Sequence, residues 1–211
     1  NNKWVTQSPG VLSSLQFIND IYSKGLGPQL SQVMTAQAGQ VLETDLMPNQ
    51  KVGIVLNGSW LPSTWASTGS KPWPQALDVY DFVKMPTQNG QAPGYTSMSG
   101  GWTLAVGAKS VEKDLGWKFI QMAVNEKYNK EYAMLDSALT PRTDVAKDSE
   151  YVNQPGTLYA KATDFIKYTH VRPSNSDYPV VSTAIQQMVE AVVTGGASPQ
   201  DAMTQFTQGV Q

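Results

Sequence analysis

Hydrophobic spacing predicts a helix near the start of the chain. From Val11 to Tyr22, apolar side chains recur at the period of one helical face. Ser8 is a candidate N-cap, and Pro9 suits the first helical position because its missing N–H has no partner there in any case. Gly25 and Gly27 are typical of the point where such a helix ends.

Two further helices are predicted at the opposite end of the chain. Apolar residues from Val181 to Val192 follow the same period, and Gly195-Gly196 closes that helix. Ser198-Pro199, followed by Asp201, is typical of a capped helix start. Weaker helical patterns cover Ala36–Leu46, Leu115–Met122 after a Ser110 cap, Tyr128–Leu135 and Thr157–Tyr168.

Strand-like patterns are short and lie in the middle of the chain. Lys51–Leu56 is an apolar run rich in β-branched residues, which is typical of a buried strand. Leu77–Lys84 alternates apolar and polar residues, and Thr103–Val106 is another short candidate. The mixture predicts an α/β fold with a small sheet flanked by helices. Because so few strands accompany so many helices, we expect the chain to be part of a larger architecture.

Composition and charge exclude several classes of protein. The 211 residues are 40% hydrophobic and 15% charged, with a formal net charge of −2. The basic residues are scattered, so no nucleic-acid partner is expected, and no apolar run approaches the ~18 residues of a membrane-spanning helix. The chain has no cysteine and only one histidine, His170, which excludes thiolate and two-histidine metal sites. No phosphate-, dinucleotide- or calcium-binding motif is present, so we expect no cofactor and no metal.

Two short segments combine small residues with tryptophan. In Gly100-Gly101-Trp102, the glycines let the backbone approach a ligand closely, and the indole is a flat apolar platform for a sugar ring. Asn57-Gly58-Ser59-Trp60 has the same form and follows a predicted strand, where α/β proteins bind ligands. Arg172 can hold ligand hydroxyls in its planar fork. The same residues also fit tight turns with core tryptophans and a solvated arginine, so both interpretations stay open.

Catalytic chemistry has less support in the sequence. A glycosidase needs two carboxylates that face each other, but Asp78 and Asp81 fall on opposite faces of their predicted strand. His170 is the only histidine that could act as a base, and no G-x-S-x-G nucleophile motif accompanies it. We therefore expect no enzyme, and a hydrolase using His170 remains an alternative.

Six short segments follow one another along the chain: Lys51–Trp60, Met85-Pro86, Ser99–Val106, Trp117–Ile120, Leu139–Asp144 and Arg172-Pro173. Their order resembles that in extracellular sugar-binding proteins of ABC importers, the family 1 or maltose-binding-protein-like group. The resemblance extends over essentially the whole chain, although Val55-Leu56 stands where the family often has Ala-Met.

The resemblance implies the C-terminal lobe of a two-lobe periplasmic-binding-protein (type II) fold. Residues 1–97 and 143–211 would form that lobe, and residues 98–142 would form the hinge and a segment that crosses to the N-terminal lobe. The first half of the N-terminal lobe would be absent, as would a signal peptide and, in a lipoprotein, the anchoring cysteine. The implied location is extracytoplasmic, in the periplasm or at the cell surface, with or without a lipid anchor.

The resemblance also implies a binding function. The protein would capture a carbohydrate, specifically an oligosaccharide, between two lobes and deliver it to the membrane permease of an ABC transporter. Trp60 and Trp102 would be stacking platforms, Gly101 a backbone contact and Arg172 a polar clamp. Further ligand-binding candidates are Ser59, Tyr95, Arg142 and Tyr178. The alternatives are a binding protein for a polyol or polyamine, the hydrolase, and a structural interaction domain in which the tryptophans are core.

Two geometric expectations follow. The strand-end loops converge, so Trp60, Gly101, Trp102 and Arg172 should lie on one face around a concavity open to solvent. If residues 98–142 belong with an absent lobe, an apolar stripe on their first helix should be exposed. That stripe, made by Leu115, Phe119 and Met122, would favour dimerisation or strand exchange of the isolated chain.

Overall fold

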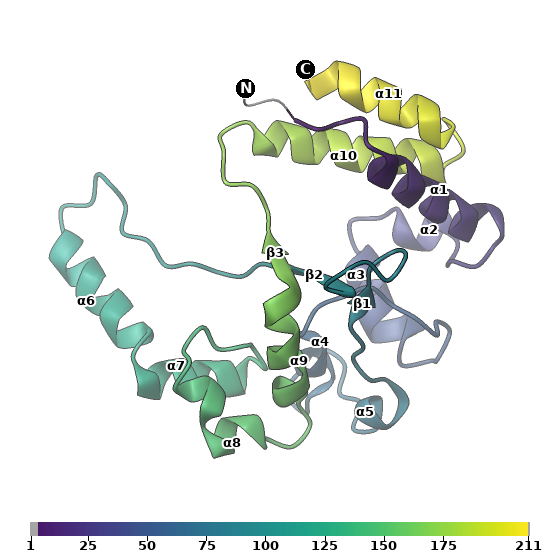
Figure 1. Ribbon diagram of the computed structural model, residues 1–211. Helices are drawn as coiled ribbons and strands as arrows, with labels where there is room; N and C mark the ends of the chain where they lie inside the picture. Colours follow the sequence, from purple (N-terminus) through teal and green to yellow (C-terminus); the bar gives the residue numbers. More distant parts are fainter. Residues whose placement is uncertain (1–3, 211) are drawn as a thin grey trace. The chain divides into compact units, whose positions relative to one another are not determined.

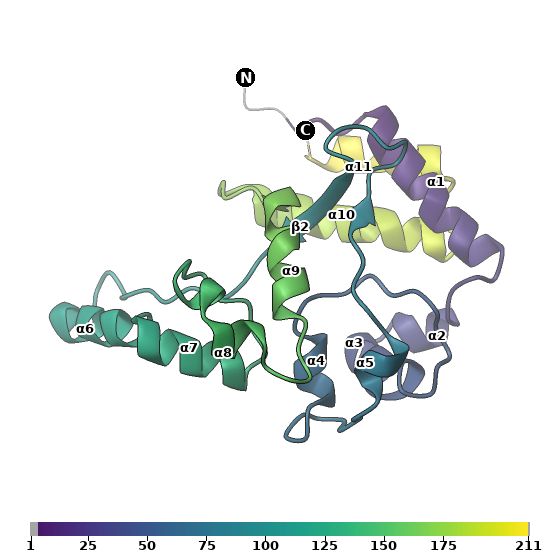
Figure 2. The ribbon, with the colours of Figure 1, turned by 60° about the horizontal axis from the view of Figure 1, so that its bottom comes forward.

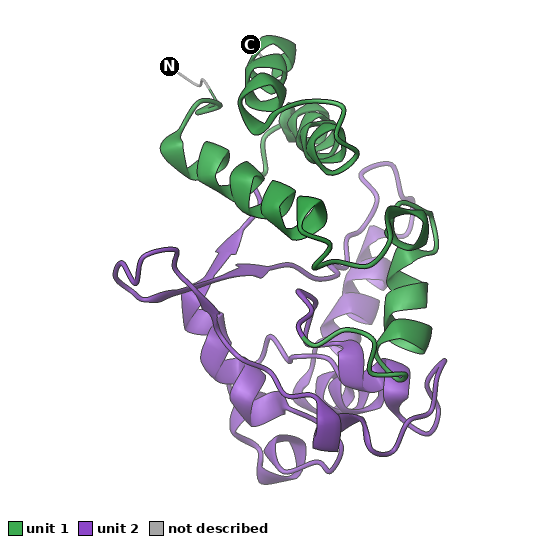
Figure 3. Ribbon diagram, turned by 90° about the vertical axis from the view of Figure 1, so that its right-hand side faces the viewer, with its two compact units in different colours: residues 1–53, 173–211 green, residues 54–172 purple. Residues whose placement is uncertain are grey.

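The computed structural model describes residues 4–210 and divides into two compact units. Unit 1 comprises residues 1–53 and 173–211, and unit 2 comprises residues 54–172 (Figure 3). The predicted segment 1–97 therefore begins outside the described residues, and the predicted segment 143–211 ends outside them. Among residues 4–210, no helix is both long and apolar enough to cross a membrane.

Unit 1 is built from helices, and the ends predicted for its long helices are confirmed. Ser8 Oγ accepts a hydrogen bond from the Val11 N–H at the start of the first long helix, and Gly25 follows that helix at a φ of 65°. Ser198 Oγ accepts from the Asp201 N–H at the start of the last helix. The helices of this unit are α1 (Pro9–Ser23), α2 (Leu30–Val33), α3 (Ala38–Val41), η1 (Leu42–Leu46), α10 (Tyr178–Val193) and α11 (Pro199–Val210).

The core of unit 1 lies between α1, α10 and α11 (Figure 1). The apolar side chains that the sequence places at helical spacing point into this core, because each helix buries its apolar face against the other two. The buried side chains are Leu15, Val181, Met188, Val192, Ala202, Met203 and Phe206.

Unit 2 contains a small sheet and several short helices. The strands are β1 (Met85–Pro86), β2 (Tyr95–Ser99) and β3 (Thr169–Val171), in the order β1-β2-β3, with β1–β2 antiparallel and β2–β3 parallel. The helices are α4 (Leu61–Trp65), α5 (Ala76–Val79), α6 (Lys113–Ala123), α7 (Glu126–Leu135), η2 (Val145–Lys147), α8 (Ser149–Val152), α9 (Tyr159–Phe165) and η3 (Ile166–Tyr168). The predicted class, a small sheet with flanking helices, is confirmed.

The three predicted strands are wrong in this structure. Lys51–Leu56 is irregular, and the Ile54 and Leu56 side chains are 95% and 82% exposed instead of buried. Leu77–Lys84 begins inside α5 and continues as coil, and Thr103–Val106 is coil in which all residues but Val106 are exposed. The physical reason is that a strand needs a neighbouring strand for its backbone hydrogen bonds, and among the described residues no strand of the sheet runs alongside these segments.

A stacked pair of tyrosines forms the core beneath α7, α8 and α9. The Tyr151 and Tyr159 rings lie 4.2 Å apart with an 11° angle between their planes, and both side chains are buried. The Tyr159 hydroxyl donates to the Ala133 carbonyl at 2.8 Å, and the Tyr151 hydroxyl donates to the Ala138 carbonyl at 3.1 Å. Burial raises the pKa of Tyr159 to about 12. These contacts hold residues 126–165 together.

The helix α6 is reached through a long exposed segment. Figures 1 and 2 show residues 100–112 running as coil from β2 to α6. On α6, Leu115, Phe119 and Met122 are 64%, 57% and 49% exposed, so the predicted exposed stripe is confirmed. Exposed apolar side chains that share one helix face are typical of an interaction site.

Candidate functional site

The parallel pair β2–β3 brings two predicted ligand residues to one edge of the sheet. Ser99 on β2 is the register partner of Val171 on β3, and both strands end at that pair. Gly100 and Arg172 are therefore the residues that directly follow the two strand ends. The carboxyl ends of parallel strands are where ligands bind in open α/β sheets. Gly101 follows Gly100, so it lies near the same edge as Arg172.

The segment after β2 leaves its tryptophan free of packing. Trp102 is 97% exposed, and the Arg172 side chain is also exposed. A Cβ added at Gly101 would meet no atom within 4 Å, so packing in unit 2 does not require glycine there. An exposed indole beside an open backbone can accept a flat apolar ligand face and donate N–H groups to hydroxyls.

Trp60 is also exposed, but its setting differs from the prediction. It does not follow a strand. Instead it is the N-cap residue of α4, and its carbonyl accepts from both the N–H and the hydroxyl of Ser63 at 2.9 and 2.7 Å. Its indole is 56% exposed and lies against Gly58, where a Cβ would sit 1.9 Å from a ring carbon. Only glycine at position 58 leaves room for the ring in this position, and Ser59 is half-buried between the two residues.

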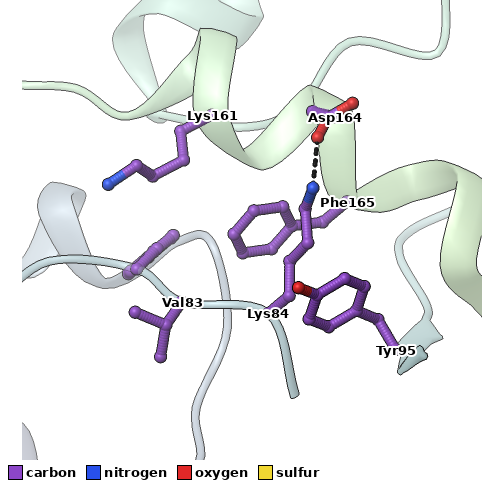
Figure 4. A pocket seen from close by; sticks show the side chains of 7 residues that line it. Val83, Lys84, Tyr95, Lys161, Asp164 and Phe165 are labelled. Atoms are coloured by element: carbon purple, nitrogen blue, oxygen red, sulfur yellow. Dashed lines mark hydrogen bonds and ion pairs between the residues drawn. The ribbon is translucent and has the colours of Figure 1, made fainter. Parts of the chain in front are cut away.

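Tyr95 lies in an open pocket of about 430 Å³ on unit 2. Figure 4 shows its ring beside Lys84 and Phe165, with Lys161 across the pocket. The ring also meets Tyr168 edge to face, with the centroids 5.4 Å apart. The lining residues are Phe82, Val83, Lys84, Tyr95, Lys161, Asp164 and Phe165.

Two ion pairs connect the walls of this pocket. Lys84 Nζ lies 2.5 Å from Asp164 Oδ2, and Lys161 pairs with Asp81. A hydrogen bond from Lys167, which has the larger effect, and one from Lys84 lower the pKa of Asp164 to about 2. The Lys161 ammonium likewise lowers the pKa of Asp81. Both carboxylates are thus fully ionised near neutral pH and fix the segment before β1 against α9.

Arg142 and Tyr178 have structural contacts. The Arg142 guanidinium donates Nε and Nη2 to the two carboxylate oxygens of Asp144, at 2.9 and 2.5 Å, and Nη1 to the Val124 carbonyl. This fork lowers the pKa of Asp144 to about 2 and ties the α6–α7 junction to the loop before η2. Tyr178 is in unit 1, at the start of α10, with its ring 6.2 Å from that of Trp4.

The residues that line two open pockets of unit 2 include neither tryptophan. The first is the Tyr95 pocket, and the second is lined by side chains of α7 with Asp148 and Glu150. In that second pocket Lys130 pairs with both carboxylates, at 2.9 and 2.6 Å. Within residues 4–210, no group of three or more histidine and acidic side chains could hold a metal ion. His170 is exposed on β3, opposite Met98.

Sequence reasoning missed the residues that organise the Tyr95 pocket. Lys84 and Asp164 are eighty positions apart, so no local pattern links them. The only sequence signal was Asp164 three residues before Lys167, a spacing that predicts a helical ion pair, which the structure contains at 2.7 Å.

No protein-family model matches the chain. Among solved structures, maltose-bound MalE3 of T. maritima is similar over 100% of this chain and 52% of its own, with a TM-score of 0.80 and 19% identity. A cyclic alpha-maltosyl-1,6-maltose binding protein from Arthrobacter globiformis is similar over 97% of this chain and 48% of its own, with a TM-score of 0.61 and 18% identity. This chain thus spans about half the length of each and has the fold of part of these sugar-binding proteins.

Proposed function

We propose that this chain is the C-terminal half of an extracytoplasmic solute-binding protein that captures a carbohydrate for an ABC importer. The observation that carries the proposal is the match of the entire chain to about half of maltose-bound MalE3 at a TM-score of 0.80. In such a protein two lobes close on the ligand by a hinge motion, and the closed form docks on a membrane permease. The protein would act in the periplasm or at the cell surface, free or lipid-anchored.

The domain organisation forms part of the proposal. Residues 1–97 and 143–211 make the C-terminal lobe, and residues 98–142 contain the hinge and a segment that packs on the absent N-terminal lobe. The exposed stripe on α6 supports this organisation, because a helix of a finished domain buries its apolar face. The extended segment of residues 100–112, exposed almost throughout, supports it as well.

The chemistry of the exposed residues favours a neutral, hydroxyl-rich ligand. Trp60 and Trp102 are two solvent-facing indoles, and Gly101 and Arg172 follow paired strands. Arg172 can donate to sugar hydroxyls while the indoles cover the C–H faces. A polyamine would require carboxylates beside the aromatic rings, and neither Gly100–Val106 nor Asn57–Trp60 contains one.

Affinity should depend on both lobes. Each stacking platform contributes on the order of 1 kcal/mol, and each net hydrogen bond contributes ~1 kcal/mol. Two platforms and a few hydrogen bonds give at most about millimolar affinity after the entropy of association is subtracted. The 211-residue chain alone should therefore bind sugar weakly or undetectably, and the full-length protein should bind at about micromolar Kd or tighter.

Calorimetry with maltose, longer maltodextrins and other oligosaccharides tests the proposal on both forms. A thermal-shift panel on the full-length protein selects the ligand first, since a bound sugar raises the melting temperature by mass action. Micromolar binding by the 211-residue chain alone would indicate a self-contained lectin-like site. Binding of no sugar by the full-length protein, or turnover of a sugar by either form, would overturn the transport function.

A further inference from the structure

One lysine of unit 2 is held by three aromatic rings and a carboxylate. The Lys84 ammonium lies 5.4, 5.6 and 5.1 Å from the ring centroids of Tyr95, Phe165 and Tyr168. Its Nζ lies 2.5 Å from Asp164, and the lysine side chain is only 25% exposed. Figure 4 shows Lys84, Tyr95, Phe165 and Asp164 converging on this point. A cation held near several aromatic rings is attracted to each, and more strongly as water is excluded.

The groups around this ammonium sit where the central strands begin. Tyr95 is the first residue of β2, and Tyr168 directly precedes β3. Lys84 itself directly precedes β1, which pairs with the first two residues of β2. The cluster therefore joins all three strands of the sheet at the end opposite Gly101 and Arg172.

The strand pair β2–β3 needs such a device because it is short. It contains three register pairs, Ser97 with Thr169, Met98 with His170 and Ser99 with Val171. A parallel pair of this length, with little buried surface on either face, specifies its register weakly. A slip of one residue would displace Arg172 from its position beside Gly100 by ~3.3 Å and turn its side chain to the other face.

We infer that Lys84 is a positioning residue for the candidate sugar site: it fixes β2 against β3, so that Gly101 and Arg172 keep their spacing beyond the strand ends. The ligand part of this inference rests on the proposed function. Lys84 acts through the strands, since its ammonium faces the rings and Asp164 at the end of the sheet opposite Gly101 and Arg172. Its replacement leaves no carboxylate without a partner, because Asp164 retains Lys167 at 2.7 Å.

The first arm of the test needs no sugar. Hydrogen exchange of the 211-residue chain is measured for the amides of residues 96–99. In Lys84→Met the exchange should accelerate by on the order of tenfold, which corresponds to ~1.4 kcal/mol, whereas Lys84→Arg should stay close to wild type. Lys167→Met is the matched control, since Lys167 pairs with the same carboxylate from a side chain that is 57% exposed. Unchanged exchange in Lys84→Met would overturn the inference. If Lys84→Met does not fold, Lys84→Gln is measured instead.

The second arm uses the full-length protein and maltose calorimetry, well below the melting temperature of each variant. Lys84→Met should weaken binding by about tenfold, Lys84→Arg should restore it, and Lys167→Met should leave it unchanged. Faster exchange in Lys84→Met with wild-type maltose affinity would overturn the positioning role. If the wild-type protein binds no sugar, the proposed function fails, and the exchange experiment still decides whether Lys84 aligns the strands.

Discussion

Ser99 on β2 and Val171 on β3 are register partners, and both strands end at that pair. The chain continues from one as Gly100-Gly101-Trp102 and from the other as Arg172, so segments about seventy residues apart in sequence share one edge of the sheet. The candidate ligand residues thus depend on a strand pairing as well as on their own motifs. The predictions below separate these contributions.

Trp102→Ala in the full-length protein should weaken sugar binding by about tenfold or more, since ~1.4 kcal/mol is a factor of ten. The physical reason is loss of a stacking platform from a side chain that makes no compensating contact in unit 2, where it is 97% exposed. Isothermal calorimetry measures the change. Phe17→Ala, at a 64% exposed position on α1, is the control and should keep wild-type affinity. Equal affinities for all three proteins would remove Trp102 from the site.

The apolar stripe on α6 should make the 211-residue chain self-associate. Leu115, Phe119 and Met122 are each about half exposed or more, and two such faces can cover each other in a symmetric dimer. Sedimentation velocity should show association that rises with concentration. Phe119→Lys should shift the chain toward monomer, whereas Phe17→Lys on α1 should not. A wild-type chain that stays monomeric at about 100 µM, and so has a dimer Kd well above that concentration, contradicts this prediction.

Tyr151→Phe should destabilise the protein by ~1–3 kcal/mol. The hydroxyl donates to the Ala138 carbonyl and accepts from the Thr140 N–H, and its loss leaves both groups without that partner in a buried environment. Urea unfolding measures the change. Tyr132→Phe removes a hydroxyl that donates to Asp136 from a side chain that is 53% exposed, so it should cost less than about 0.5 kcal/mol. Similar effects of the two variants would argue against the buried tyrosine network.

The Asp164 carboxylate should make stability depend on acid pH. Its pKa in the folded protein is about 2, below the ordinary value of 3.8, because Lys167, with the larger effect, and Lys84 both donate hydrogen bonds to it. A lowered pKa means that the contribution is present above pH 3.8 and is lost as the pH falls toward about 2. Wild type should therefore be more stable than Asp164→Asn near neutral pH, and their urea midpoints should converge at about pH 2. Midpoints whose difference does not change with pH would contradict the ion-paired geometry.

His170→Ala distinguishes a binding protein from a hydrolase. The side chain is exposed on β3, so the substitution should leave stability within about 0.5 kcal/mol of wild type. Sugar affinity in the full-length protein should be unchanged, since the binding function assigns His170 no role. Product analysis by chromatography after long incubation with oligosaccharides should detect no turnover in either protein. Turnover that disappears in His170→Ala would favour the hydrolase.

The three long helices of unit 1 and their ends follow from the sequence alone. Ser8 caps α1, Ser198 caps α11 and Gly195 ends α10 at a φ of 73°, because caps and left-handed glycines act over a few neighbouring residues. The exposed stripe on α6 was also predictable, since helical periodicity marks an apolar face whether or not a partner covers it.

The strands and the ligand residues depended on tertiary structure. A strand exists only where another strand accepts its hydrogen bonds, so the apolar run at Lys51–Leu56 stays irregular, and the less hydrophobic Tyr95–Ser99 pairs on both sides. The same dependence separates the ligand candidates. Arg142 and Arg172 each adjoin a proline in the sequence. The fold pairs the Arg142 guanidinium with both carboxylate oxygens of Asp144 and leaves Arg172 exposed beyond a strand end. Local sequence fixes which residue types are available, and long-range pairing decides which of them face solvent.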